Sequence, residues 1–210
     1  SGFPFWGVDA GGYSGFADEE TYLRWTEFAA FSPIMRFHGV TPREPWAYSR
    51  YAVSVYKFYA WLRENLLKYS VHTAEEAHKT GIPMMRPLPM VFPKDKEAVY
   101  WEDEYFYGSD LLVAPVHQEG EKRRIYFPSG SWINLLDFRK MVGGNRIFQV
   151  DVPIDKIPVY IREGACILSV MNGELQLGQS MTYEKKNTVL MSRALNETSG
   201  KRYADGKEIE

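Results

Sequence analysis

Residues 5–13, FWGVDAGGY, and residues 34–39, IMRFHG, decide how this chain folds. The first stretch is a short apolar run that ends in Asp9, two glycines and the ring of Tyr13. A short apolar run bounded by glycine is typical of a buried strand. Paired glycines permit a sharp exit from such a strand, because glycine accepts positive φ. The sequence therefore predicts a buried strand over 5–9 with Asp9 at its carboxyl end.

An amphipathic helix is predicted between the two stretches, over residues 18–31. Asp18 suits its N-cap, and Pro33 ends it, since proline disfavours helical geometry at the preceding residue. A second short strand follows over residues 34–38 and ends at His38. The strand–helix–strand order brings both carboxyl ends to one mouth, where α/β barrels gather their binding groups.

The ordered motifs of the chain resemble those of glycoside hydrolase family 31, which holds α-glucosidases, α-xylosidases and related retaining enzymes. The resemblance spans about the first four fifths of the chain, so a chance match of so many motifs is improbable. One departure is Lys68, where the family more often has proline, and it falls in the middle of a predicted helix. The matching stretches are 5–13, 23–25, 30–33, 35–38, 43–46, 81–88, 92–93, 107–116 and 157–165.

The resemblance implies a fold of two kinds, α/β followed by all-β. Residues 1–83 correspond to the last two βα units of a (β/α)8 barrel. Residues 84–170 correspond to an antiparallel β-sandwich, and residues 171–210 to the start of a further β domain.

The sequence pattern after residue 48 agrees with this order. Apolar residues recur at helical spacing from 49 to about 80, and Gly81 with Pro83 ends the helix. His72 and His78 lie on it at a spacing that does not share one face, so we interpret both as structural or exposed. Short strands punctuated by glycine and proline follow, as in an antiparallel sandwich. The predicted strands are 105–107, 111–116, 123–127, 132–135, 147–152 and 158–161, with weaker signals at 175–177 and 188–191 and a hairpin turn at 203–206.

The catalytic groups of the family are expected outside this chain. A retaining glycosidase needs two carboxyl groups about 5–5.5 Å apart. The resemblance implies two aspartates on barrel strands that precede the Asp9 motif, and neither matching motif occurs here. Asp9, Asp18, Glu19 and Glu44 do not match them. We therefore assign no catalytic residue to this chain.

The resemblance does imply that this chain forms one wall of a sugar pocket. His38 matches a histidine that hydrogen-bonds sugar hydroxyls, and Tyr13 matches an aromatic residue that lines the pocket. Asp9 is expected to support this wall from behind, with Arg36 as its partner, because a buried carboxylate must be paired. Taken alone, the Asp-x-Gly-Gly pattern favours an Asp9 that only caps the helix or ties down its turn. Residues 43–46 either close the rim or form a packed loop.

Composition limits the other classes of function. The 210 residues carry a formal net charge of −2, which excludes the basic footprint of a nucleic-acid-binding protein. The sequence holds no apolar run long enough for a transmembrane helix, and the lone Cys166 excludes an intramolecular disulfide and a thiolate zinc site. We expect no cofactor, no metal, no nucleic acid and no membrane partner, and we favour the cytoplasm.

The expected partners are an α-linked oligosaccharide or glycoside and the N-terminal remainder of the same enzyme, while homo-oligomerisation stays open. Ser1 opens almost directly on a strand, so the chain is expected to be a fragment that folds poorly alone. The alternative function is a non-catalytic carbohydrate-binding or scaffold protein, with Trp132 and Tyr126 as exposed sugar platforms. Core packing is the more common role for such aromatics in a sandwich.

Overall fold

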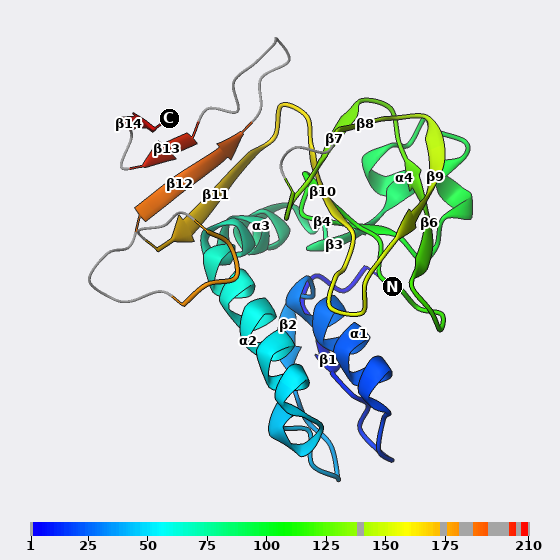
Figure 1. Cartoon of the computed structure of the whole chain (residues 1–210). Helices are drawn as coiled ribbons and strands as arrows, with labels where there is room; N and C mark the ends of the chain where they lie inside the picture. The colour runs from blue at the N-terminus through cyan, green and yellow to red at the C-terminus, as the bar shows by residue number, and fades with distance from the viewer. Residues whose placement is uncertain are drawn as a thin grey trace.

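The computed structural model describes residues 2–137, 141–172, 176–180, 187–192, 202–204 and 207–209, and Figure 1 shows their arrangement. The helices are α1 (Glu19–Ala30), α2 (Arg50–Asn65), α3 (Leu67–Thr80) and α4 (Leu88–Val91), with 3-10 turns at Pro45–Ala47 and Ala98–Tyr100. The strands are β1 (Gly7–Asp9), β2 (Ile34–Arg36), β3 (Met85–Pro87), β4 (Tyr105–Tyr107), β5 (Leu111–Val113), β6 (Lys122–Phe127), β7 (Ser131–Asn134), β8 (Met141–Gly143), β9 (Arg146–Asp151), β10 (Val159–Arg162), β11 (Cys166–Met171), β12 (Asn187–Ser192), β13 (Arg202–Ala204) and β14 (Lys207–Ile209).

The predicted strand–helix–strand unit at the start of the chain is confirmed. Strands β1 and β2 are parallel, and Asp9 lies opposite Arg36 in their register. Helix α1 joins them and begins as predicted, since the Asp18 carboxylate accepts a hydrogen bond of 2.7 Å from the Thr21 N–H. Val8 packs with Ala29 of α1 on one side of the pair.

The first strand is shorter and more exposed than predicted. It spans three residues, and of these only Val8 is buried. Side chains alternate between the two faces of a strand, so Val8 points toward α1 while Gly7 and Asp9 lie on the opposite face. On that face Gly7 is exposed and Asp9 is half-buried, so it is partly open to solvent. The predicted strand is therefore confirmed, but its predicted burial holds only for Val8.

The centre of the molecule is a six-stranded sheet in the order β3-β4-β5-β10-β7-β8, and all its pairs are antiparallel. Helices α1–α3 lie on one face of this sheet in Figure 1, and the β6–β9 ribbon lies on the other. The antiparallel pairing expected for this region is confirmed. The structure adds β3 and β8, which were not predicted.

Alternation along the central strands explains why they read as continuous apolar runs. Tyr105 and Tyr107 of β4 pack into the core shared with the helices, whereas Phe106 between them packs into the second core. Strand β5 repeats the pattern, with Leu112 facing the second core. Because each face has its own core, neither set of side chains needs to be polar.

The second core contains the aromatics considered as sugar platforms. Trp132 is fully buried, its Nε1–H donates to the Pro128 carbonyl at 2.9 Å, and Tyr126 is 4% exposed. A buried ring cannot stack on a sugar at the surface. Trp132 and Tyr126 are core residues, which is the more common role of aromatics in a sandwich. The interpretation of the two as sugar platforms is wrong.

The predicted helix over 49–80 is in fact two helices that meet at Leu66. At this break the carbonyl of Asn65 accepts a hydrogen bond of 3.0 Å from Ser169 Oγ of β11. Its amide donates to the Val170 carbonyl at 2.7 Å and its side-chain oxygen accepts from the Gly178 N–H at 2.8 Å. Lys68 therefore lies in the first turn of α3 rather than mid-helix, where proline is also tolerated.

Strands β11–β14 form a separate four-stranded sheet above α3 (Figure 1). Strand β12 covers the weak strand signal at 188–191. Strands β13 and β14 pair as a hairpin, with Ala204 opposite Lys207. The predicted turn residues 205–206 lie outside the described residues, as does Leu175 of the other weak signal. The domain boundaries at 83/84 and 170/171 stay predictions.

A buried arginine joins α1 to two loops of the β region. Arg24 is 7% exposed and donates to the carbonyls of Val152, Pro153 and Lys156 in one loop, each at 3.0 Å, and to the carbonyl of Gly120 in the other at 3.3 Å. Its neighbour Glu27 is 1% exposed, and one of its carboxylate oxygens lies 3.5 Å from the guanidinium. Burial raises the pKa of Glu27 to about 8, and the attraction of Arg24 opposes this shift. Burial prevails because its effect is the larger of the two.

We predict that Glu27 makes the folded chain less stable as pH rises. The folded state holds the Glu27 proton up to about pH 8, whereas the unfolded chain releases it near its ordinary pKa of 4.5. Between these values the free energy of unfolding should fall with pH, by at most about 1.4 kcal/mol per pH unit. Urea unfolding of the full-length protein across this range should show a shallower dependence of unfolding free energy on pH for Glu27→Gln than for the wild type.

The matched control is Glu64→Gln, an exposed glutamate on α2, which should keep the wild-type slope. Glu104, whose pKa burial also raises to about 8, adds a slope of the same sign, so Glu27→Gln should reduce the slope without abolishing it. Equal slopes for wild type and Glu27→Gln would contradict the prediction.

Candidate functional site

The loop after β1 turns sharply because two successive residues are left-handed. Gly11 has φ of +82° and Gly12 has φ of +81°, a region that side chains with a Cβ rarely enter. The Gly12 N–H donates to the Asp9 carbonyl at 2.8 Å and closes the turn, and the Ala10 N–H reaches the Arg36 carbonyl at 3.1 Å. The turn places Tyr13 just past the carboxyl end of the strand.

Tyr13 and His38 meet at the carboxyl ends of the two strands. Their ring centroids lie 5.6 Å apart with the planes tilted by 44°. Both side chains are exposed, Tyr13 at 55%. The Val40 N–H donates to the Tyr13 carbonyl at 2.9 Å, which ties the two loops together beside the rings. Within the described part of the chain the His38 imidazole makes no hydrogen bond, so its nitrogens are open to a ligand.

Asp9 and Arg36 form the predicted pair. Arg36 Nε lies 2.6 Å from an Asp9 carboxylate oxygen, and the two residues are opposite one another in the parallel register. The Arg36 side chain is 53% exposed, so the ion pair adds little stability by itself. Its effect is to orient the Asp9 carboxylate at the base of the Tyr13 turn.

The carboxylates of this end of the molecule all have structural partners. Asp18 caps α1, and the backbone N–H of Thr21 lowers the pKa of its carboxyl group. Glu19 accepts a hydrogen bond of 2.8 Å from Ser49 Oγ, at the start of α2. Glu44 accepts from the Arg43 N–H at 3.1 Å. Each of these acids therefore has a structural role, and the absence of a catalytic residue from this chain stays a prediction.

Arg43, in the stretch interpreted as either rim or packed loop, belongs to the packed loop. Its side chain is 3% exposed and donates from Nε to the Gly12 carbonyl at 2.7 Å. Trp46 of the same stretch is 72% exposed. The sequence does not reveal the difference, because an arginine that binds loop carbonyls has no signature in its own neighbours. The sequence likewise does not reveal the role of Gly39, which lies next to His38.

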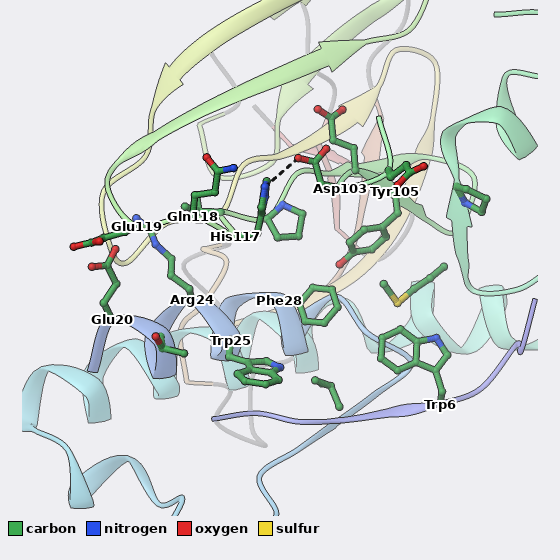
Figure 2. Close-up of a pocket in the computed structure, with 18 of the residues that line it drawn as sticks. Trp6, Glu20, Arg24, Trp25, Phe28, Asp103, Tyr105, His117, Gln118 and Glu119 are labelled. Atoms are coloured by element: carbon green, nitrogen blue, oxygen red, sulfur yellow. Dashed lines mark ion pairs between the residues drawn. The ribbon is translucent and has the colours of Figure 1, made fainter. Parts of the chain in front are cut away.

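A cavity of about 800 Å³ among the described residues lies elsewhere. Figure 2 shows Trp6, Trp25 and Phe28 along one side of it and Asp103 with His117 across from them. Val8 lines this cavity, while Asp9, Tyr13 and His38 do not. Because Val8 and Asp9 point to opposite faces of β1, the cavity lies behind the strand pair and is separate from the Tyr13–His38 mouth.

The described part of the chain shows neither a metal-binding cluster nor a membrane-spanning helix. Its His, Cys, Asp and Glu side chains form no group of three that could hold a metal ion. Among the helices of the same residues, none combines the length and apolar character needed to cross a membrane. His72 and His78 are both exposed on α3, in agreement with their interpretation from the sequence.

Comparison with known families gives two adjoining matches. Residues 1–73 match the TIM-barrel domain of glycosyl hydrolase family 31, and residues 81–167 match the C-terminal domain of the same family. Between them the two models cover most of the chain. They meet near the end of α3, where the helices give way to the central sheet.

Individual relatives agree with the family models. An isomaltosyltransferase of Sporosarcina globispora is 35% identical over 193 residues, which are 85% of this chain and 18% of the relative. An alpha-xylosidase of Saccharolobus solfataricus is 34% identical over 175 residues, 80% of this chain and 24% of the relative. This chain therefore spans about a fifth of the length of such relatives.

Among solved structures, the cycloalternan-forming enzyme from Listeria monocytogenes, determined in complex with its pentasaccharide substrate, aligns with a TM-score of 0.85 at 31% identity. The alignment covers 90% of this chain and 19% of that enzyme. The strand-end motifs, the two domain models and these relatives lead to one conclusion: the chain belongs to glycosyl hydrolase family 31.

Proposed function

We propose that this chain is the C-terminal portion of a retaining α-glycoside hydrolase of the α-glucosidase or α-xylosidase kind. The observation that carries the proposal is the convergence of Tyr13 and His38, whose exposed rings lie 5.6 Å apart past two parallel strand ends. An aromatic ring packs against the apolar face of a sugar, and an imidazole can donate to or accept from a hydroxyl. A single sugar ring could contact both side chains.

The reaction itself is assigned to the remainder of the polypeptide. A double displacement needs one carboxylate to attack the anomeric carbon and a second carboxyl group to protonate the leaving oxygen and later activate water. The carboxylates near Tyr13 are held by structural partners, as described above. We therefore place both catalytic aspartates on barrel strands outside these 210 residues, which face the Tyr13–His38 wall across the bound sugar.

The barrel is proposed to continue at both edges of the β1–β2 pair. Within the described residues these two strands pair only with each other, and an isolated parallel pair leaves its backbone hydrogen-bonding groups open on both sides. Strands from the N-terminal remainder would extend the pair and close the barrel. The exposed face that carries Asp9 and Arg36 would then lie inside it.

One feature favours this proposal over a non-catalytic descendant of the family. A scaffold has no physical need for an open imidazole beside an exposed aromatic ring at strand ends. The choice between a glucoside and a xyloside depends on groups that meet the hydroxymethyl arm of the sugar, and we place these in the remainder of the barrel as well.

The isolated 210-residue chain should hydrolyse no α-glycoside, because it supplies a pocket wall without the reacting carboxylates. The test compares it with the full-length protein on p-nitrophenyl α-glucoside and p-nitrophenyl α-xyloside under identical conditions. The full-length protein should release nitrophenol from at least one of the two, and the isolated chain should match buffer. Turnover by the isolated chain would show that the assignment of the catalytic groups is wrong.

In the full-length protein, His38→Ala should lower turnover with little change in melting temperature. Loss of a preorganised donor to a sugar hydroxyl costs on the order of 3 kcal/mol in the transition state, or about a hundredfold in rate. Since such a bond strengthens as the sugar ring distorts, kcat should fall more than KM rises.

His72→Ala is the matched control, since it makes the same chemical change at an exposed position on α3. It should leave both kcat and melting temperature near their wild-type values. A His38→Ala protein with wild-type kcat and a lowered melting temperature would mean that His38 is a structural residue only.

A further inference from the structure

We infer that Arg43 is a positioning residue that sets the distance between Tyr13 and His38 by holding their two loops together. The structural part of this inference stands on the contacts of Arg43 alone, and only its effect on turnover rests on the proposed function. Arg43 lies in the loop that follows His38, and its side chain reaches across to the loop that carries Tyr13.

The guanidinium grips the Tyr13 loop on both sides of that residue. Nε donates at 2.7 Å to the carbonyl of Gly12, the residue before Tyr13. Nη2 donates at 2.7 Å to the carbonyl of Gly15, two residues after Tyr13. The remaining nitrogen, Nη1, stays within its own loop, where it donates to the Pro42 carbonyl at 3.1 Å and to Thr41 Oγ1. One planar group therefore links both loops.

The backbone of Arg43 is itself anchored to the helix layer. The Tyr22 hydroxyl donates to the Arg43 carbonyl at 3.0 Å. Tyr22, on α1, is fully buried, and its ring stacks on Tyr48 with centroids 4.0 Å apart. The clamp thus starts from a fixed base, so movement of the Tyr13 loop would have to break its hydrogen bonds.

The two loops lie so close together at Gly39 that a side chain there would collide with the Tyr13 loop. A Cβ on Gly39, next to His38, would lie 2.8 Å from the Tyr13 carbonyl oxygen and 3.0 Å from Arg43 Nε. Thr41 adds a bond of 2.6 Å from its hydroxyl to the Gly15 carbonyl. A lysine has a single side-chain nitrogen, which cannot donate to Gly12 and Gly15 in the two directions of the guanidinium fork.

The charge of Arg43 is balanced by dipoles rather than by an acid. It is 3% exposed and takes part in none of the ion pairs found among the described residues. Carbonyl oxygens of the two loops surround it instead. Arg43 therefore does not act as a member of an ion pair, and its buried position is explained by the two loops that it connects.

Arg63 provides a matched control for a purely structural arginine. It too donates to backbone carbonyls, at 2.6 Å to Ser32 and 2.6 Å to Pro33. Those residues form the turn that enters β2, at the end of the strand away from His38. Replacing Arg63 with lysine should therefore destabilise the fold without moving the two loops of the mouth.

The experiment compares Arg43→Lys with Arg63→Lys in the full-length protein. The probe is hydrogen exchange at the Val40 amide, which donates to the Tyr13 carbonyl. Its exchange should be at least tenfold faster in Arg43→Lys and within twofold of wild type in Arg63→Lys. On an α-glycoside that the wild type hydrolyses, Arg43→Lys should lower kcat/KM tenfold or more. Arg63→Lys should leave kcat/KM near the wild-type value even when it loses as much melting temperature as Arg43→Lys.

A second variant keeps the test decisive if Arg43→Lys does not fold. Thr41→Val removes one acceptor of the guanidinium and the donor to Gly15, and should quicken Val40 exchange by a smaller factor than Arg43→Lys. Val40 exchange that is equal in both arginine variants, or unchanged in Thr41→Val, would overturn the inference. An inactive full-length wild type would refute the proposed function, while Val40 exchange would still decide the role of Arg43.

Discussion

The parallel register that sets Asp9 opposite Arg36 determines the geometry of the whole mouth. Because the strands run in the same direction, both exits lie at one edge, and the glycine turn after β1 meets the loop after β2 there. A one-residue shift of register would turn every side chain to the other face. It would direct Asp9 toward α1 and separate the two rings. The ion pair adds little stability, yet it marks the one register in which Tyr13 and His38 are neighbours.

Buried or half-buried arginines hold the irregular segments around this pair. Arg24 binds carbonyls of the loops that reach α1, Arg63 binds the turn before β2, and Arg43 binds the loops after both strands. Loop carbonyls lack the regular partners that helices and sheets provide, so each must find a donor when it is covered. A guanidinium can satisfy several at once. Arg24 thus holds the loops that contact α1, Arg63 holds the turn that enters β2, and Arg43 holds the two loops that carry Tyr13 and His38.

Much of this arrangement could be predicted from local sequence. Glycine placement and apolar period indicate the two strands, Asp18 and Pro33 mark the limits of α1, and the strand–helix–strand order predicts that Tyr13 and His38 converge. The break at Leu66 could not be predicted, because Asn65 takes its partners from residues more than a hundred positions away. Strands β3 and β8 are likewise defined by their partners, since three residues carry too little periodicity.

The central claim is that the wall formed by the two strand-end loops binds a sugar. A crystal structure of the full-length protein with an α-linked disaccharide bound would test it most directly. The account predicts a His38 ring nitrogen within about 3.2 Å of a sugar hydroxyl and the Tyr13 ring against the same sugar. A disaccharide bound in the catalytic pocket with neither side chain in contact would contradict it.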